Sequence, residues 1–338
     1  MESSVGIQPI SISQRLAENG IHVSQGDSLS LYEEWPTPTA IVSDGGYGVN
    51  GFEGDTLSHS DLPEWYEEHI KAWSRFAAPY TTLWFWNTEI GWATLHPILE
   101  KYGWRYVSCN VWNKGKGHIA GNANSKTLRR FPIVTEVCVQ YARDVRIDKM
   151  TLQFWLIHEW ARTGLPFYKS NEACGVKNAA TRKYLTKCHL WYFPPPEAFE
   201  RLAAYANTHG KPEGRPYFSI DGEESLTASQ WALMRSKFKC PYGVTNVWDH
   251  NALRNKERIK RGAKSIHLNQ KPLALMNTII EASTDPGDVV WEPFGGLFSA
   301  SVGAYKLNRT VYGAEIDEKI FQMGQQQLLE AVQEWQLF

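Results

Sequence analysis

Apolar residues recur with two different periods along this chain of 338 residues. Short apolar runs bounded by turn-forming residues are typical of buried strands, and apolar positions three and four residues apart are typical of helices. The short runs predict strands at residues 21–23, 40–43, 81–86, 106–112, 134–141, 289–291 and 310–314. The helical spacing predicts helices at residues 62–76, 91–102, 273–282 and 318–335, and one that ends near residue 307. Strands that alternate with helices indicate an α/β fold, in which helices cover both faces of a mostly parallel sheet.

This alternation stops in the middle of the chain, from about residue 144 to 264. Pro194, Pro195 and Pro196 follow one another there, among scattered glycines and aromatic residues. Because such residues interrupt regular structure, we expect an irregular inserted subdomain at residues 144–265. It separates a first part, residues 1–143, from a last part, residues 266–338. We expect the polar residues 1–20 to form a loose arm.

Composition narrows the class of protein. Hydrophobic residues make up 43% of the chain and charged residues 21%, which suits a globular enzyme. The chain has 15 Trp, 15 Tyr and 14 Phe, most of which we expect in the core, with a few left to stack on a base. A formal net charge of −1 argues against a surface that is basic throughout, but it allows one basic face.

Cysteine spacing and hydropathy restrict the environment of the chain. No pair among Cys109, Cys138, Cys174, Cys188 and Cys240 has C-x-x-C spacing, so we expect neither a metal site nor a redox dithiol. An odd cysteine count without a secretory signal favours the reducing cytoplasm. No apolar run approaches the roughly 20 residues of a membrane span, so we expect no association with a membrane.

A glycine turn near the end of the chain predicts a nucleoside-binding site. Residues 288–296 are Asp-Val-Val-Trp-Glu-Pro-Phe-Gly-Gly, the pattern of a strand, a tight turn and the start of a helix. Glycine lets the backbone approach a ligand closely, and a carboxylate at the end of the next strand can accept both ribose hydroxyls. Glu315 occupies that strand end. From this segment alone, NAD, ATP and a purely structural turn remain open.

Three motifs in a fixed order resemble the β-group of DNA amino-methyltransferases. Residues 267–272, His-Leu-Asn-Gln-Lys-Pro, resemble its H-x-x-Q-K-P motif, and residues 292–296 resemble its D-P-F-x-G-x-G cofactor motif. Asp44-Gly45-Gly46-Tyr47 stands where the catalytic D/S/N-P-P-Y motif belongs. The segments around residues 106–114 and 131–141, the latter with Glu136, resemble later strands of the same half.

This resemblance covers most of the chain outside the insert. It implies a Rossmann-like methyltransferase fold with circularly permuted motif order. The catalytic half, residues 1–143, comes first; a target-recognition insert, residues 144–265, follows; and the cofactor half, residues 266–338, comes last.

The cofactor implied by the resemblance is S-adenosyl-L-methionine. Phe294, Gly295 and Gly296 then line its methionine and ribose side, and Glu315 binds the ribose hydroxyls. The other residues with an implied role are Gln270 and Lys271 near the carboxylate of the cofactor, Asp27 near its adenine end, and Glu292 at the start of the turn. Lys271 as a helix cap and Asp27 as an ordinary turn residue are the alternatives.

The implied reaction transfers a methyl group to the exocyclic amino nitrogen of a base. That nitrogen is a poor nucleophile because its lone pair is delocalised into the ring. Two acceptors for its hydrogens free the lone pair, and we expect them to be the Asp44 carboxylate and the Gly45 carbonyl, with Tyr47 stacking on the base. The base must leave the duplex to reach these groups. An initial Asp accompanies N6-adenine in the family, so we favour adenine, with N4-cytosine as the alternative.

The chain departs from the family pattern at four positions. Gly45 and Gly46 replace two prolines that normally make the catalytic turn rigid, and glycine is the most permissive residue. Phe298 stands where a second glycine is usual, and Glu292 replaces the usual Asp. A plain β-turn is the alternative interpretation of residues 44–47.

Two basic stretches are candidates for contacts with the phosphates of double-stranded DNA. The first contains Lys114, Lys116, Lys126, Arg129 and Arg130 and no acidic residue. The second contains Arg254, Lys256, Arg258, Lys260, Arg261 and Lys264, beside Glu257. An ordinary solvated surface is the alternative in both cases.

Competing functions follow from the same residues. The chain is expected to be a DNA methyltransferase of restriction-modification type, and a cognate restriction endonuclease and a homodimer are open partners. The alternatives are a DNA-binding homologue that has lost catalysis through the Gly45-Gly46 turn, and a methyltransferase for RNA or a small molecule.

Overall fold

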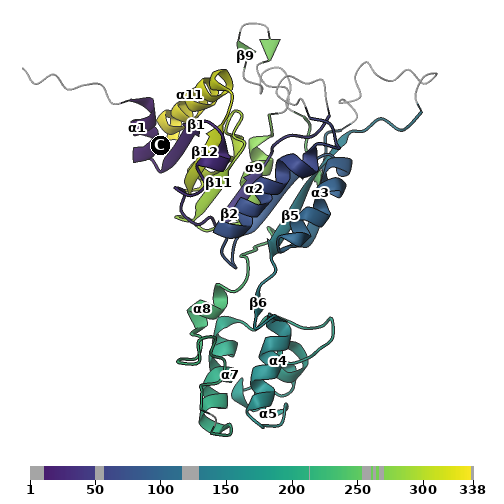
Figure 1. Cartoon of the computed structure of the whole chain (residues 1–338), viewed down its shortest axis with the longest axis vertical. Coiled ribbons are helices and arrows are strands. Elements are labelled where there is room, and N and C mark those ends of the chain that lie inside the picture. Colours follow the sequence, from purple (N-terminus) through teal and green to yellow (C-terminus); the bar gives the residue numbers. More distant parts are fainter. Residues whose placement is uncertain are drawn as a thin grey trace, which may run out of the picture. The chain divides into compact units, whose positions relative to one another are not determined.

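The computed structural model describes residues 11–49, 57–115, 129–212, 214–252, 260–261, 264–265 and 270–335 (Figure 1). The chain forms two compact units. One consists of residues 1–143 and 236–338, and the other of residues 144–235. The first is called the sheet unit below and the second the helical unit.

The sheet unit contains one sheet of eight strands. In spatial order they are β1 (Ile21–Gln25), β12 (Thr310–Glu315), β11 (Val289–Glu292), β2 (Ala40–Ser43), β3 (Thr82–Asn87), β5 (Thr135–Arg143), β4 (Trp104–Asn113) and β8 (Val247–Asp249). The first five are parallel to one another, β5 is antiparallel to both of its neighbours, and β8 is parallel to β4. The carboxyl ends of the five parallel strands therefore meet at one edge of the sheet.

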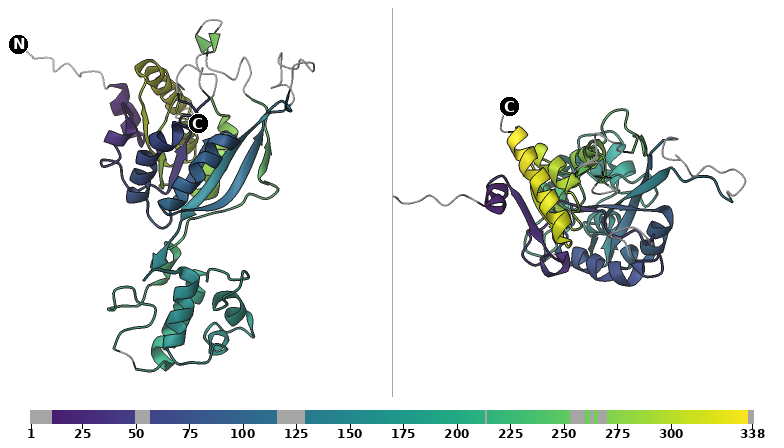
Figure 2. Two further views of the ribbon diagram at one scale, coloured as in Figure 1. Left: turned by 45° about the vertical axis from the view of Figure 1, so that its right-hand side comes forward. Right: turned by 90° about the horizontal axis from the view of Figure 1, so that it is seen from above.

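Side chains that alternate along the strands separate the two faces of this sheet. Ile41, Leu83 and Phe85 pack on one face with α2 (Leu62–Phe76) and α3 (Glu89–Lys101). Val42, Trp84 and Trp86 pack on the other with α9 (Leu273–Ser283) and α10 (Ser299–Lys306). At the β1 end, α1 (Ile12–Glu18) and α11 (Glu318–Trp335) lie side by side, α11 in yellow (Figure 2). The predicted mostly parallel α/β sheet with helices on both faces is confirmed.

The predicted elements of this unit are confirmed to within a few residues, and those at residues 40–43, 62–76 and 318–335 match to the residue. One helix was missed. Residues 1–20 were expected to form a loose arm, but α1 begins after Ser11, whose hydroxyl accepts a hydrogen bond from the Gln14 amide while the Gln14 side chain accepts one from the Ser11 amide. This reciprocal capping box, Ser-x-x-Gln, was the sequence signal for the helix.

The insert ends earlier than expected. The helical unit begins at Asp144, as the sequence indicated, but it ends at Arg235 and not at residue 265. After it, Lys237 forms ion pairs of 2.9 Å with Asp285 and 2.8 Å with Asp288 in the sheet unit. Strand β8 then extends the main sheet, and a short hairpin follows, formed by β9 (Lys260–Arg261) and β10 (Lys264–Ser265).

The helical unit is not irregular, contrary to the expectation. It contains the hairpin β6 (Arg146–Ile147) and β7 (Met150–Thr151) and the helices α4 (Leu152–Arg162), α5 (Lys169–Ala173), α6 (Ala179–Tyr184), α7 (Pro196–His209) and α8 (Ala228–Ala232). Its own apolar core includes the fully buried Trp155, Trp160 and Trp231. The prolines do not exclude a helix, because Pro196 stands at the first turn of α7, where its missing N–H would have no partner in any case.

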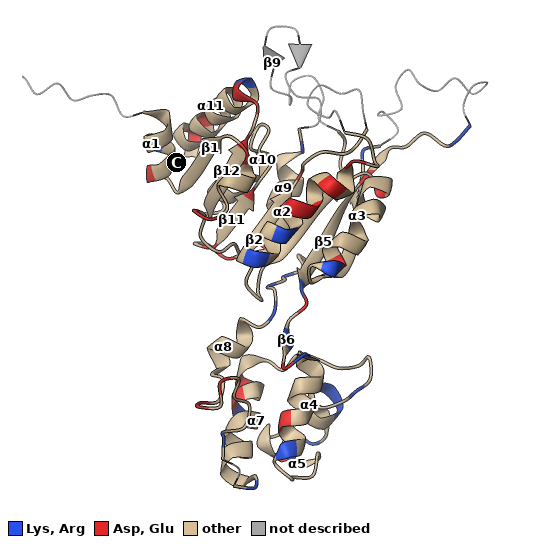
Figure 3. Ribbon diagram, in the orientation of Figure 1, with Lys and Arg blue, Asp and Glu red and all other residues tan. Residues whose placement is uncertain are grey.

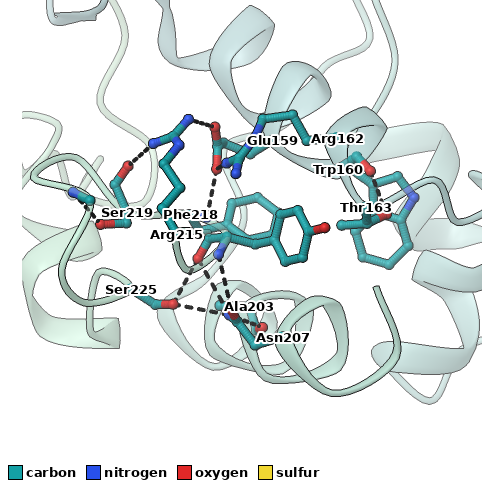
Figure 4. Close-up of polar contacts among 12 residues, drawn as sticks. Glu159, Trp160, Arg162, Thr163, Ala203, Asn207, Arg215, Phe218, Ser219 and Ser225 are labelled. Carbon is teal, nitrogen blue, oxygen red and sulfur yellow. Dashed lines mark hydrogen bonds and ion pairs between the residues drawn. The ribbon is translucent and has the colours of Figure 1, made fainter. Parts of the chain in front are cut away.

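One buried carboxylate organises the polar part of that core (Figure 4). Glu159 of α4 is fully buried, and it accepts hydrogen bonds from Arg162 at 2.6 Å, Arg215 at 2.9 Å and the Phe218 amide at 2.8 Å. Because two guanidinium groups and an amide satisfy this carboxylate, its burial is compatible with a stable fold.

Candidate functional site

Acidic and polar residues follow the five parallel strands at the edge where their carboxyl ends meet. Asp27 comes after β1, Glu315 ends β12, Glu292 ends β11, Asp44 comes after β2 and Asn87 ends β3. The main chains of β1 and β12 lie in register here, since Gln25 is opposite Glu315 and the Gly26 amide donates to the Glu315 carbonyl at 2.9 Å. This edge is where open α/β sheets bind their ligands.

At the β2 end of the edge, a buried lysine contacts the Asp44 carboxylate. Lys271 Nζ donates to Asp44 Oδ1 at 2.7 Å and to Oδ2 at 2.9 Å. It also lies 3.5 Å from Glu136 Oε2. Only 2% of the Lys271 side chain is exposed. Burial alone lowers the pKa of Lys271, but the charges of Asp44 and Glu136 outweigh it and raise the pKa above its ordinary value. Lys271 was expected near the carboxylate of a cofactor; its observed partners are Asp44 and Glu136.

Glu136, the second residue of β5, extends this arrangement. Its other oxygen, Oε1, forms an ion pair with Lys114, and the Lys114 ammonium lies over the Trp112 ring at 4.9 Å. Burial raises the pKa of Glu136, but the two lysines more than compensate and lower it. Asp44, Lys271, Glu136 and Lys114 thus form a row of alternating charges.

Tyr47, the last residue of the turn at residues 44–47, also contacts this group. Its hydroxyl donates to Asp44 Oδ1 at 2.7 Å and lies 3.4 Å from Glu136 Oε2. Burial, followed by the charges of these two carboxylates, raises the pKa of Tyr47 well above its ordinary value. The hydroxyl is therefore a hydrogen-bond donor throughout the physiological pH range. The Lys271 ammonium lies 5.0 Å from the Tyr47 ring centroid.

The contacts of Asp44 leave acceptor capacity on one oxygen. A carboxylate offers about four lone-pair positions, two on each oxygen. Tyr47 and Lys271 occupy both positions of Oδ1, whereas Oδ2 accepts only from Lys271 among the described contacts. The Asp44 side chain is 21% exposed. One acceptor position on Oδ2 is therefore open to an N–H donor from outside.

The turn after Asp44 leaves no room for a side chain at its first glycine. A Cβ atom on Gly45 would lie 2.7 Å from Phe294 Cδ2 and 2.7 Å from the Tyr66 hydroxyl. Phe294 in turn packs among the aromatic rings of α2, with Trp65 at 5.1 Å and His69 at 4.8 Å. The glycine at this position is therefore a steric requirement of the aromatic packing. The Gly45 carbonyl oxygen accepts no hydrogen bond within the described part of the chain.

The second glycine turn is built around an aromatic ring. Phe298 is fully buried and has a left-handed backbone, with φ 57°. Its ring lies 2.2 Å from the position that a Cβ on Gly295 would take, and 2.6 Å from that on Gly324. A left-handed φ favours glycine, which is the usual residue of the family pattern at position 298. Here glycines around the phenylalanine make the room that its ring needs.

The carboxylates of Glu315 and Glu292 accept hydrogen bonds from different segments. Glu315 Oε2 accepts from the Gly296 amide at 2.7 Å and Oε1 from the Asp317 amide at 2.8 Å, so the carboxylate at the end of β12 is joined to the glycine turn. Glu292 is buried, and its carboxylate accepts from the amides of Ala300 and Ser301 in the first turn of α10. Burial raises the pKa of Glu292 to about 7. The observed contacts of Glu292 are those of a helix cap.

Asp27 and Gln270 are the two other residues that were expected near the cofactor. Asp27 is exposed and caps a short 3-10 helix, Ser28–Ser30, by accepting from the Leu29 amide at 2.9 Å. Tyr32 follows this helix, and its hydroxyl lies 3.0 Å from Nδ1 of the buried His69. Burial lowers the pKa of His69 to about 4. Gln270 Oε1 is buried and has no hydrogen-bond partner among the described residues.

The residues that were predicted to contact phosphates differ in their exposure to solvent. Lys114 is 12% exposed and forms an ion pair with Glu136, and its contact with DNA stays a prediction. Arg129 and Arg130 are exposed. Lys116, Lys126, Arg254, Lys256 and Arg258 lie outside the described residues, as do His267, Leu268 and Asn269 of the H-x-x-Q-K-P motif.

Three residues of the site were not assigned a role from the sequence. Glu136 was noted only as part of a strand, and Tyr66 and Asn87 only as parts of a helix and a strand end. The available signal was polarity in an apolar setting, since Glu136 and Asn87 stand in runs of apolar strand residues. Charged residues are almost never fully buried unless they are paired.

Two further features of the described residues bear on this site. No group of three or more His, Cys, Asp or Glu side chains is arranged to hold a metal ion there. In the same residues, no helix combines the length and apolarity needed to cross a membrane.

A family model described as "DNA methylase", for N6 and N4 methyltransferases, matches residues 39–326. Among curated proteins, the "DNA adenine methyltransferase YhdJ" of Escherichia coli (strain K12) is 36% identical over 111 residues, which is 31% of this chain and 36% of that protein. The "Type II methyltransferase M.HinfI" of Haemophilus influenzae is 35% identical over 86 residues, 25% of this chain and 24% of that protein. The aligned segments thus span about a third or less of these relatives.

Solved structures show the same fold at low sequence identity. The structure titled "crystal structure of M1.HpyAVI-SAM complex" has a TM-score of 0.52 at 15% identity, over 91% of this chain and 98% of that one. The Pvu II DNA methyltransferase, described as cytosine-N4-specific, has a TM-score of 0.53 at 12% identity, over 92% of this chain and 90% of that one.

The packing around Gly45 predicts that Gly45→Ala destabilises the chain. The added methyl group must displace Phe294 or Tyr66, and overpacking of this kind costs roughly 1–3 kcal/mol. Urea unfolding measures the loss. Gly214→Ala is the matched control, because nothing lies within 4 Å of the Cβ that it adds. Equal stability of the two variants would contradict the predicted steric requirement.

Proposed function

The chain belongs to the N6/N4 DNA methylase family, and from this premise we propose that it transfers a methyl group from S-adenosyl-L-methionine to the exocyclic amino nitrogen of a base in DNA, N6 of adenine. The observation that supports this most is the state of Asp44. Lys271 and Tyr47 hold its carboxylate, one acceptor position on Oδ2 stays open, and the Gly45 carbonyl accepts no hydrogen bond from the described residues.

These two acceptors match what the reaction requires of the protein. An exocyclic amino group has two hydrogens, and Asp44 Oδ2 and the Gly45 oxygen each accept one of them. Both bonds withdraw the hydrogens from the plane of the base and localise the lone pair on nitrogen. Transfer forms the N–C bond, breaks the C–S bond and releases one proton from the nitrogen. The acceptors act without rearrangement because Lys271 and Tyr47 already fix the carboxylate.

The residues at the other end of the edge fit the proposed cofactor. S-adenosylmethionine supplies the methyl group on a positively charged sulfur. Glu315 ends β12, and we assign its carboxylate to the ribose hydroxyls of the cofactor, with Gly295 and Gly296 of the adjacent turn on the methionine side. Among the described residues Gln270 Oε1 is buried and without a hydrogen-bond partner, so we assign it to the cofactor. We assign Asp27, which follows β1, to the adenine end of the cofactor.

The identity of the base rests on Asp44. An initial Asp favours adenine, and the curated relative from E. coli is named as an adenine methyltransferase. The cytosine-N4-specific Pvu II enzyme shares the fold, so cytosine is the second candidate. In both cases the same two acceptors serve the amino group.

Mass spectrometry of nucleosides tests the function and the base together. DNA from cells that express the chain is compared with DNA from cells that express Asp44→Ala. We expect N6-methyladenine with the native chain and none with the variant, because the variant lacks the carboxylate acceptor.

The result also separates the alternatives. N4-methylcytosine in place of N6-methyladenine would overturn the choice of base and retain the mechanism. If neither modified base forms, although the protein binds S-adenosylmethionine and DNA, the chain is a silent DNA-binding homologue.

For target recognition we propose the helical unit, and within it a basic depression beside α4. A cavity of about 550 Å³ is lined by Arg146, Lys149, Met150, Thr151, Phe154, Ile157, His158, Ala161 and Lys187. Four of these side chains are basic and none is acidic, although Asp144 pairs with Arg146 at 2.8 Å just outside the lining. Blue segments lie beside α4 in Figure 3. Phe154 is 46% exposed and offers an aromatic face. Such a surface suits phosphates and bases.

Charge reversal tests this surface. The double variant Lys149→Glu, Lys187→Glu should bind a DNA duplex at least about tenfold more weakly, and the slope of log affinity against log salt should fall by up to about 2, because two phosphate contacts are lost. Fluorescence anisotropy measures both. The control, Lys169→Glu with Lys211→Glu, changes the net charge of the same unit equally, away from the cavity. An equal loss in the two double variants would contradict a specific role of the depression.

A further inference from the structure

The main-chain carbonyl of Gly46 is held by two side chains from different elements. The Tyr66 hydroxyl of α2 donates to it at 3.2 Å, and Asn87 Nδ2, at the end of β3, donates at 3.1 Å. Both donors are fully buried residues. Two buried donors from different elements thus converge on one main-chain carbonyl of the glycine turn.

The orientation of Asn87 is itself fixed. Its Oδ1 accepts from the Thr88 amide at 2.9 Å, so its Nδ2 must face the Gly46 carbonyl. The first turn of α3 is shaped to admit this side chain, since a Cβ on Gly91 would lie 2.0 Å from Asn87 Oδ1. The Tyr66 ring is likewise confined, by Phe85 at 5.1 Å and Phe294 at 6.0 Å.

The turn needs such external support because its own residues supply none. Gly45 and Gly46 follow each other, and glycine loses more conformational freedom on folding than any other residue. On one side of the turn, Lys271 fixes Asp44. On the other side, the bonds from Tyr66 and Asn87 fix the peptide group between Gly46 and Tyr47. The peptide that carries the Gly45 carbonyl lies between these fixed points and makes no hydrogen bond of its own within the described part of the chain.

We propose that Asn87 and Tyr66 are positioning residues for methyl transfer: by pinning the Gly46 carbonyl, they hold the Gly45 carbonyl where it accepts the second amino hydrogen of the base. Non-covalent bonds from two neighbouring elements thus give the Gly-Gly turn the rigidity that prolines would give covalently. This inference rests on the proposed function and adds residues to it. Neither residue touches the base or the cofactor in this role.

Single-turnover methyl transfer to DNA tests the proposal with the variants Tyr66→Phe and Asn87→Ala and with their combination. Each single variant leaves one donor on the carbonyl, so we expect each rate to fall about threefold. The double variant leaves none, and we expect a loss on the order of a hundredfold, more than the product of the single losses. The dissociation constant of S-adenosylmethionine should stay within about twofold of the native value, because the cofactor residues are unchanged.

Tyr141→Phe is the matched control. It also removes a buried tyrosine hydroxyl with hydrogen bonds, here to Trp92 at 2.7 Å and His96 at 2.9 Å, but these lie on α3 and away from the turn. The control should transfer methyl groups at the native rate. Tyr66→Phe keeps the ring and its packing, so it stays informative if Asn87→Ala does not fold.

Two results overturn the inference. One is a double variant that binds the cofactor normally and transfers at the native rate. The other is a double variant whose transfer rate falls only as much as its affinity for S-adenosylmethionine falls, or only as much as the rate of the Tyr141→Phe control. Failure of the proposed function looks different, because then the native chain itself transfers no methyl group to DNA.

Discussion

The ion pair between Asp44 and Lys271 is the interaction on which the site depends. It joins residue 44 to residue 271, so the turn at residues 44–47 and the H-x-x-Q-K-P motif meet only in the folded protein. A buried ammonium is costly unless it is fully paired, and Lys271 is satisfied by both Asp44 oxygens and by Glu136. Removing one partner of such a pair typically costs about 3–5 kcal/mol, because the other charge remains buried. In the proposed reaction the same pair orients the carboxylate toward the amino group.

Aromatic rings and glycines set the shape of the two turns around this pair. Phe294 fills the space beside Gly45, and Phe298 fills the space beside Gly295. In each turn, therefore, a glycine leaves space for an aromatic ring, and the ring packs against the backbone of that glycine. The departures from the family pattern at residues 45 and 298 are thus matched to their neighbours. Polar contacts add to this: Glu315 joins the second turn to β12, and Glu292 caps the helix that follows it.

Much of the fold was predictable because its elements are long and strongly periodic. The strand and helix at residues 40–43 and 62–76 follow from local pattern alone, and so does the final helix. The helical unit was misjudged, since α5, α6 and α8 have only five or six residues each and prolines and glycines stand between its helices. Its core also depends on contacts between segments far apart in sequence, such as Glu159 with Arg215. Strand β8 has only three residues, too few for a periodic signal.

The candidate site was predictable where a motif names the residue and not where partners decide its role. Glu315 ends β12, and Asp44 and Tyr47 lie in the turn after β2, as the order of motifs indicated. The partner of Lys271 was not predictable, because a lysine in a sequence carries no information about which carboxylate lies beside it in space. For the same reason Lys114 was assigned to DNA, whereas it pairs with Glu136. Asn87 and Tyr66 act on a main-chain carbonyl, which no side-chain motif records.

The most direct test of this account is the rate of single-turnover methyl transfer by Lys271→Gln. The central claim is that Lys271 orients the Asp44 carboxylate that accepts an amino hydrogen. The account predicts a loss of at least about a hundredfold, on the scale of a lost transition-state contact, while S-adenosylmethionine still binds. Near-native transfer by a variant that binds the cofactor would contradict the claim, and Lys271 would then serve only the stability of the fold.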